Sequence, residues 1–163
     1  NLIAINWGQA GDTPAPGDYD GDGKADFVVR RPNGGAGNYY KYFSNGTFGF
    51  EVFGTATAQI VPGDYDGDGR TDICTFRPNG GTYEWSYEPS GTAGTTAVTE
   101  QWGFVGQDLP AQGDYNGDGQ TEFGVYRIAD GNFWSFNNGS RAINAQPWGA
   151  EPGDVPAAGY NTH

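Results

Sequence analysis

Side chains that carry oxygen recur at fixed spacing in three glycine-rich segments, at residues 17–26, 63–72 and 113–122. Counted from Asp18, Asp64 or Asp114, each segment has an acidic or amide side chain at positions 1, 3, 5 and 9 and a glycine at position 6. This density of oxygen suits Ca²⁺, a hard cation that takes about six to eight oxygen ligands, and glycine permits the sharp bend that brings the later ligands around. Without a divalent cation the carboxylates would repel one another. The spacing therefore predicts three calcium-binding loops.

The predicted ligands are the side chains at positions 1, 3, 5 and 9 and the backbone carbonyl at position 7. They are Asp18, Asp20, Asp22, Lys24 and Asp26 in the first loop, Asp64, Asp66, Asp68, Arg70 and Asp72 in the second, and Asp114, Asn116, Asp118, Gln120 and Glu122 in the third. The third loop carries one formal charge fewer, which predicts weaker binding there. Mg²⁺ is disfavoured because a flexible cage made only of protein oxygens suits the larger ion. The simpler alternative, solvated Asp-Gly turns without metal, is disfavoured by three coincident copies.

The loops recur every 46 to 50 residues, a period typical of propeller blades and stacked β-repeats. An apolar run ending in arginine follows each loop, as in 27–31, 73–77 and 123–127, and then comes a turn that contains Asn-Gly or Asp-Gly. An aromatic strand follows; Tyr83, Trp85 and Tyr87 alternate with polar residues, which indicates one buried face. With 29 Gly and 10 Pro, no stretch has a sustained helical pattern. We predict an all-β fold of tandem antiparallel β-blades of propeller type.

The expected organisation is a single repeat domain, 1–163, with three complete repeats and a half-repeat at each end. The half-repeats cover 1–13 and 156–163, and the repeats cover 14–61, 62–109 and 110–155. Known propeller rings take about four or more blades, so three blades do not close one alone. Either the ends meet in an incomplete fourth blade, or they pair with another copy, or the sequence belongs to a longer protein. Exposed terminal strands are templates for strand addition, which makes self-association an expectation.

At these residues the chain resembles the bacterial VCBS/FG-GAP-like repeat family, which is related to the β-propeller of integrin α-subunits. The matching pattern is Pro-Gly-Asp-Tyr-Asp-Gly-Asp-Gly-x-x-Asp-apolar-x-x-x-Arg-Pro, with Trp-Gly closing a unit, and it covers residues 2 to 160. The resemblance implies propeller-type blades, Ca²⁺ in the loops between strands, and secretion. It also implies a role in adhesion or as a module of a larger surface protein.

Composition excludes several classes of partner. The chain has 20 Asp+Glu against 8 Lys+Arg and a net charge of −12, and eleven of the acids lie in the three loops. A nucleic-acid partner is not expected, since phosphate binding needs clustered Lys and Arg. No apolar run approaches membrane-spanning length, so we expect no membrane insertion. The sequence has no Met and begins at Asn1, which fits a mature product whose upstream signal has been removed.

Catalytic chemistry has little to use in this chain. The only histidine is His163, so histidine-based triads and zinc sites have no basis. Glu84, Glu88 and Glu100 could pair as glycosidase carboxylates, but ordinary surface positions are the preferred interpretation. We predict that the protein is not an enzyme.

Recurring aromatic and basic residues are expected to be structural. Cys74 lies in a strand-like run and is predicted to be a small buried hydrophobe. The recurring arginines are expected to pack over aromatic rings or to pair with loop carboxylates, and the tryptophans that close the repeats to belong to the core. These residues are Arg31, Arg77 and Arg127, and Trp7, Trp102 and Trp148.

The favoured function is a non-catalytic, secreted, Ca²⁺-stabilised β-repeat protein that acts as a structural or adhesive element at the cell surface. Self-assembly into a filament or ring through the terminal half-repeats is part of this hypothesis. The alternative is a lectin-like or matrix-binding propeller module of a larger surface protein, with glycans or extracellular matrix as partners. A third possibility is an accessory domain of a secreted polysaccharide-degrading enzyme.

Overall fold

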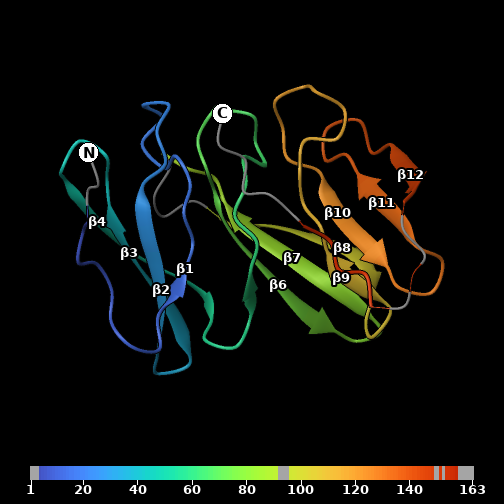
Figure 1. Cartoon of the computed structure of the whole chain (residues 1–163), viewed down its shortest axis with the longest axis horizontal. Helices are drawn as coiled ribbons and strands as arrows, with labels where there is room; N and C mark the ends of the chain where they lie inside the picture. Colours follow the sequence, from blue (N-terminus) through green and yellow to red (C-terminus); the bar gives the residue numbers. More distant parts are fainter. Residues whose placement is uncertain (1–3, 92–95, 149–150, 152, 158–163) are drawn as a thin grey trace.

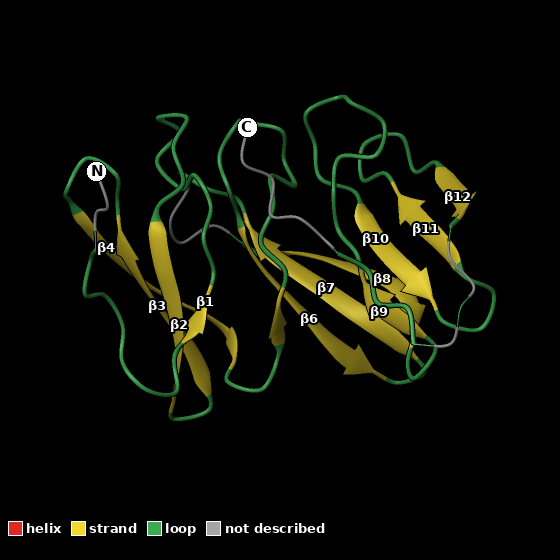
Figure 2. Cartoon of the chain, in the orientation of Figure 1, coloured by secondary structure: helices red, strands yellow, loops and turns green. Residues whose placement is uncertain are grey.

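The computed structural model describes residues 4–91, 96–148, 151 and 153–157, which form three four-stranded antiparallel sheets and no helix. The sheets lie side by side along the longest axis of the molecule (Figure 1). The prediction of an all-β chain of antiparallel sheets is confirmed (Figure 2). The propeller type stays a prediction. Within the described residues, membrane-spanning helices are absent.

Strands follow chain order within each sheet, so each strand is hydrogen-bonded to the next one along the chain. Sheet 1 contains β1 (Thr13–Pro14), β2 (Phe27–Asn33), β3 (Ala36–Tyr42) and β4 (Phe48–Thr55). Sheet 2 contains β5 (Gln59–Ile60), β6 (Ile73–Asn79), β7 (Thr82–Glu88) and β8 (Val98–Phe104). Sheet 3 contains β9 (Asp108–Pro110), β10 (Phe123–Arg127), β11 (Asn132–Phe136) and β12 (Ile143–Pro147). The predicted sequence of loop, apolar strand, turn and aromatic strand is therefore present in every sheet, while the repeat boundaries remain predictions.

The turns between the apolar and aromatic strands use glycine as expected. Gly34, Gly80 and Gly131 have φ angles of 58°, 66° and 67°, a left-handed conformation that other residues adopt with strain. This turn places each aromatic strand beside its apolar strand, for example Phe76 opposite Trp85 and Cys74 opposite Tyr87.

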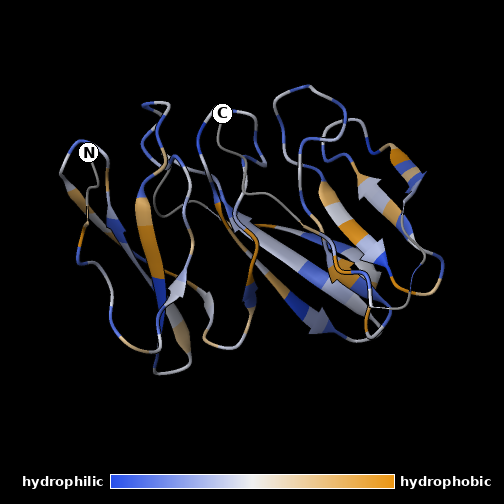
Figure 3. Ribbon diagram, in the orientation of Figure 1, coloured by the Kyte–Doolittle hydropathy of each residue, from blue (hydrophilic) through white to orange (hydrophobic). Residues whose placement is uncertain are grey.

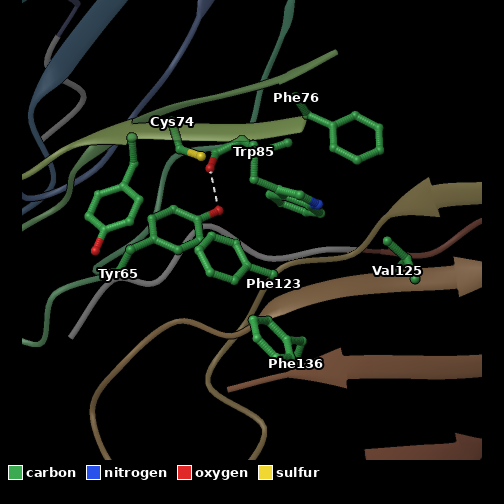
Figure 4. Packing of buried hydrophobic residues seen from close by; sticks show 9 residues of the cluster. Tyr65, Cys74, Phe76, Trp85, Phe123, Val125 and Phe136 are labelled. Atoms are coloured by element: carbon green, nitrogen blue, oxygen red, sulfur yellow. Dashed lines mark hydrogen bonds between the residues drawn. The ribbon is translucent and has the colours of Figure 1, made fainter. Parts of the chain in front are cut away.

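The hydrophobic core lies between consecutive sheets. One cluster joins sheets 2 and 3, with Trp85 and Tyr65 from sheet 2 and its loop facing Phe123 and Phe136 of sheet 3 (Figure 4). A smaller cluster joins sheets 1 and 2. Figure 3 shows hydrophobic residues on central strands such as β2 and β10, and hydrophilic residues along the loops. Cys74 is buried in the larger cluster, as predicted, and burial raises the pKa of its thiol.

The chain ends differ from complete sheets. Residues 4–12 form no strand, but Trp7 packs on Tyr42 and Phe48 of sheet 1, and its indole Nε1 donates to the Tyr40 carbonyl at 3.3 Å. Most of the predicted half-repeat 156–163 lies outside the described residues. The prediction that Trp148 belongs to the core is wrong: it is 74% exposed, because no described sheet follows sheet 3.

Candidate metal centre

Each loop connects the first and second strands of its sheet, and a backbone bridge joins the two ends of the loop. An isolated bridge pairs Gly17 with Asp26, and the same bridge joins Gly63 to Asp72 and Gly113 to Glu122. The tyrosine at position 2 holds the loop to the chain segment before it: the Tyr65 hydroxyl donates to the Val61 carbonyl at 2.7 Å. A bridge between positions 0 and 9 forces the eight residues between them into one compact turn.

The turn gathers carboxylates from positions that lie apart in sequence. The groups with at least one carboxylate oxygen each within 4.8 Å of the others are Asp18, Asp20 and Asp22 in the first loop, Asp64, Asp66 and Asp72 in the second, and Asp114, Asp118 and Glu122 in the third. Three predicted ligands therefore converge in every loop. Asp26 and Asp68 lie in the same loops but outside these groups, and Asn116 hydrogen-bonds Asp118 and Glu122 of the third. The carbonyls of Lys24, Arg70 and Gln120 remain predicted ligands.

Backbone N–H groups hold the position-1 and position-9 carboxylates in place. Asp18 accepts from the N–H groups of Gly21 and Gly23, both at 2.7 Å, and Asp26 accepts from the Tyr19 N–H at 2.8 Å. The second and third loops repeat this pattern; Asp64, for instance, accepts from the Gly67 N–H at 2.7 Å. These bonds leave few rotamers to the side chains, so their oxygens are already arranged for a cation.

Sequence reasoning missed a polar residue in the second turn of each repeat that closes the far side of the loop. The Ser44 N–H donates to Asp26 at 2.8 Å, the Ser90 N–H donates to Asp72 at 2.6 Å, and the Asn137 amide donates to Glu122 at 2.8 Å. A signal was present: each of these residues stands one or two positions before the glycine of that turn.

Burial and crowding leave negative charge uncompensated in the first two loops. Burial, and secondarily the charges of Asp66 and Asp64, raise the pKa of Asp72 to about 8, although two N–H groups act in the opposite direction. Burial likewise raises the pKa of Asp26 and of Asp64. A divalent cation among these oxygens would supply the missing positive charge and restore ordinary ionisation.

The third loop compensates its carboxylates differently. The Asn116 amide Nδ2 donates to Asp118 and to Glu122, both at 2.9 Å. An amide N–H therefore occupies space between the two acids that a cation would use, and Asn116 would have to turn its amide to offer oxygen instead. Weaker binding in the third loop stays a prediction.

Consecutive loops are in direct contact. The Thr71 N–H, at position 8 of the second loop, donates to the Asp18 carbonyl at 2.6 Å, and the Thr121 N–H donates to the Asp64 carbonyl at 2.6 Å. A cavity of about 440 Å³ is lined by the position-1 aspartates of all three loops. Asp18 and Asp64 thus offer a side chain to their own loop and a backbone carbonyl to the next one.

The recurring arginines have structural partners. Arg31 binds Asp12 through two hydrogen bonds of 2.8 Å and lies over the Tyr40 ring, and Arg127 binds Asp108 at 2.8 and 2.9 Å. Arg127 also lies 4.9 Å from the centre of the Phe104 ring, so packing over aromatic rings is confirmed at these two arginines. Arg77 instead pairs with Glu84 on the same sheet. None of the three pairs with a loop carboxylate, the other partner expected: Asp12 precedes β1, Asp108 begins β9 and Glu84 lies on β7.

The donor set predicted for the loops consists of carboxylate, amide and backbone carbonyl oxygens, which fits a hard divalent cation. Such an ion would neutralise the crowded acids and fix the loop against its neighbour. Within the loops the described residues offer neither histidine nor cysteine, so nothing there favours a softer metal.

Comparison with known proteins identifies one family. Residues 18–75 match the FG-GAP-like repeat family, a span that runs from the first loop through β2 to β5 and the second loop into β6. Searches of curated proteins and of solved structures gave no match. The chain therefore carries an FG-GAP-like repeat at residues 18–75, and its described residues form three sheets of the same design.

Proposed function

We propose that this chain is a non-catalytic, secreted β-repeat protein that binds Ca²⁺ in its three loops and serves as a structural or adhesive element at the cell surface. In this proposal the ions stabilise the fold, and copies assemble end to end through their terminal repeats. The observation that carries the proposal is the position of the carboxylate clusters, where consecutive sheets touch.

The same residues take part in ion binding and in the contact between sheets, so the two are coupled. Asp18 and Asp64 are predicted ligands, and their carbonyls accept the N–H groups of Thr71 and Thr121 from the next loop. An ion that orders the side chain of either aspartate also orders the backbone that receives the neighbouring loop. Metal binding is thereby linked to the stacking of sheets.

The expected stabilisation is large. If each site has a Kd of about 10 µM and outside Ca²⁺ is about 1 mM, linkage supplies roughly 2.7 kcal/mol per site. Three sites then contribute about 8 kcal/mol, comparable with the whole free energy of unfolding of a typical domain.

Thermal unfolding in Ca²⁺, in Mg²⁺ and in excess EDTA tests this role. Ca²⁺ should raise the Tm strongly and Mg²⁺ much less. A variant with Asp64→Asn and Asp66→Asn should lose about a third of the Ca²⁺ effect, whereas Asp130→Asn, in an exposed turn outside the loops, should keep all of it. A Tm that EDTA leaves unchanged would refute calcium stabilisation.

The alternative, a lectin-like or matrix-binding module of a larger surface protein, is favoured by exposed aromatic side chains. Phe48 on β4 and Trp148 after β12 are 67% and 74% exposed. Stacking of such rings on sugars is a common mode of glycan binding. A glycan array probed with monomeric protein in Ca²⁺ distinguishes the two functions, because the structural role requires no glycan.

A further inference from the structure

The contact between sheets 2 and 3 is made by a repeated set of residues. We call the face of a sheet that points toward the following sheet its forward face, and the opposite one its rear face. The forward face of sheet 2 presents Tyr65 and Trp102, which stack on Phe123 and Phe136 of the rear face of sheet 3 at centroid distances of 5.1 and 5.3 Å. This pair of faces shows how one repeat receives the next.

The forward face of sheet 3 carries the corresponding residues, which are more exposed than those of sheet 2. Tyr115, at position 2 of its loop, is 49% exposed, whereas Tyr65 is fully buried. Trp148, the counterpart of Trp102, is exposed as well, and it lines a cavity of about 400 Å³ together with Tyr126, Phe133 and residues 154–157 of the same chain, which cover this face in part. This face keeps the aromatic residues that sheet 2 uses to hold its neighbour.

Two glycines show that the third loop also keeps room for another loop. A Cβ at Gly63 would lie 2.7 Å from Thr121 of the next loop, and a Cβ at Gly67 would lie 2.7 Å from Gln120. At Gly113, the counterpart of Gly63, the nearest described atom outside its chain neighbours is 3.6 Å away and belongs to Tyr115 of the same loop; at Gly117 the space is open. The docking position is present but free among the described residues.

The rear face of sheet 1 is the complementary surface. Phe27 and Tyr42 pair across β2 and β3 as Phe123 and Phe136 pair across β10 and β11. Phe48 and Phe50 of β4 extend this row, and Phe50 is 59% exposed. A row of exposed apolar side chains along one sheet face is typical of an interaction surface.

The N-terminal segment shows what this rear face receives. Trp7 lies 5.5 Å from the Tyr42 ring, as Trp102 lies 5.3 Å from the Phe136 ring. The turn after Trp7 also matches the turn after Trp102: the Gln9 N–H donates to Asp12 at 2.8 Å, and the Phe104 N–H donates to Asp108 at 2.8 Å. Residues 7–12 therefore occupy the place where the Trp-Gly end of a preceding sheet would lie.

The first loop and the third loop are also complementary in charge. Inside the chain the position-7 side chain crosses the preceding loop, as Gln120 does when its Nε2 donates to the Asp66 carbonyl at 3.1 Å. In the first loop this residue is Lys24, whose side chain is exposed, and the loop that it would meet carries Asp114 and Asp118. A lysine in this place would face an acidic surface.

We propose that the forward face of sheet 3 docks on the rear face of sheet 1 of a second copy. Trp148 takes the place of Trp7 against Tyr42, and the Ala25 N–H donates to the Asp114 carbonyl as Thr71 donates to Asp18. Because the two surfaces differ, the contact is head-to-tail and repeats until a ring closes or a filament grows. The inference rests on the proposed function for the assembly itself, and it assigns the faces and the residues.

Sedimentation velocity of the full chain over a concentration series in Ca²⁺ measures the association. Phe50→Asp should block the rear face and weaken association about tenfold or more. Gly113→Ala should crowd the forward face, because its methyl would meet the Ala25 Cβ as a Cβ at Gly63 would meet the Thr121 Cβ, at 3.0 Å. Its effect should be about several-fold, since Ala25 lacks the Cγ2 and Oγ1 atoms of threonine. The matched controls are Ile128→Asp, an exposed apolar residue in the β10–β11 turn, and Gly81→Ala, a glycine in a turn with open space around it; both should associate like the unmodified chain. Circular dichroism confirms that each variant keeps its fold.

Mixing the two blocked variants tests the head-to-tail geometry. Each retains one good face, so an equimolar mixture of Phe50→Asp and Gly113→Ala should form 1:1 dimers that grow no further. Trp7→Ala should strengthen association, because the N-terminal segment then competes less for the rear face. Weaker association of Trp7→Ala, or a mixture that forms no dimers, would overturn the assignment.

The outcomes separate this inference from calcium stabilisation. A chain that stays monomeric at all concentrations in Ca²⁺, while Ca²⁺ still raises its Tm, overturns the docking and leaves the structural role of the ion intact. Association that Phe50→Asp and Gly113→Ala both weaken, with a Tm indifferent to EDTA, supports the docking and refutes calcium stabilisation.

Discussion

Replacing Gly63 with alanine tests whether the sheets are joined at their loops. The added Cβ would lie 2.7 Å from both Cγ2 and Oγ1 of Thr121, closer than real Cβ contacts. Thr121 is buried and its N–H is bound to the Asp64 carbonyl at 2.6 Å, so it cannot retreat without separating the loops. Overpacking of this kind costs about 1–3 kcal/mol, and weakening the hydrogen bond adds about 1 kcal/mol. We therefore expect Gly63→Ala to lower the free energy of unfolding by about 2–4 kcal/mol.

The third repeat provides the matched control. Gly113 occupies the same position of its loop, but its Cβ would meet only the Tyr115 ring at 3.6 Å, an ordinary contact. Gly113→Ala should stay within about 0.5 kcal/mol of the unmodified chain or be slightly more stable, because alanine reduces the entropy of the unfolded state.

Urea unfolding in saturating Ca²⁺, followed by tryptophan fluorescence at a concentration where the chain is monomeric, measures the difference. With an m-value of about 2 kcal/mol/M, Gly63→Ala should shift the midpoint down by about 1–2 M. Adding Thr121→Ala should recover part of the loss, since it removes the two clashing atoms and couples the sites. Equal midpoints for Gly63→Ala and Gly113→Ala would refute loop contact as the joint between sheets.

Three further predictions concern single side chains. Asp108→Asn should lower the free energy of unfolding by about 2–4 kcal/mol in urea, because it breaks a buried ion pair with a bidentate arginine, whereas Glu84→Gln, whose arginine partner is largely exposed, should cost less than about 1 kcal/mol. Asn116→Asp should tighten Ca²⁺ binding in the third loop, measured by calorimetry, because it replaces an inward amide N–H with a carboxylate; unchanged affinity would contradict the ligand assignment. The hydrogen bond with Arg31 lowers the pKa of Asp12, so this pair stabilises the fold fully above the ordinary carboxylate pKa of 3.8 and loses its effect as pH falls through the lowered value; the difference in urea midpoint between Asp12→Asn and the unmodified chain should shrink in that acidic range.

Local sequence pattern was sufficient to predict the strands. The alternation of Tyr83, Trp85 and Tyr87 reports one buried face directly, and the structure buries Trp85 and Tyr87 in the core between sheets 2 and 3. The same holds for the loops, because bridges such as Gly63–Asp72 close within ten residues. Periodicity and turn chemistry depend on residues close together in sequence, so strands and loops can be predicted from one repeat alone.

Contacts between repeats were beyond that reasoning. Nothing in the loop sequence indicates that Thr71 donates to Asp18 or that Gly63 must lack a side chain, because both depend on how two sheets stack. Aligned repeats also misled at Trp148: its match to Trp102 predicted a buried residue, but burial comes from the sheet that follows and not from the tryptophan itself. The sequence of a repeat shows that a residue could be buried in a contact, but burial also requires a neighbouring sheet that packs against it.

One residue pattern stabilises the chain internally and, in the proposed docking, would also join one copy to the next. The contacts that Tyr65 and Trp102 make with sheet 3 are internal only because sheet 3 belongs to the same chain. Tyr115 and Trp148 are the equivalent rings on the forward face of sheet 3, and both are exposed. Burying them against another sheet would release free energy that the described residues do not use. Here the N-terminal segment at Trp7 covers part of the rear face of sheet 1, so a second copy that docks there as proposed would have to compete with that segment.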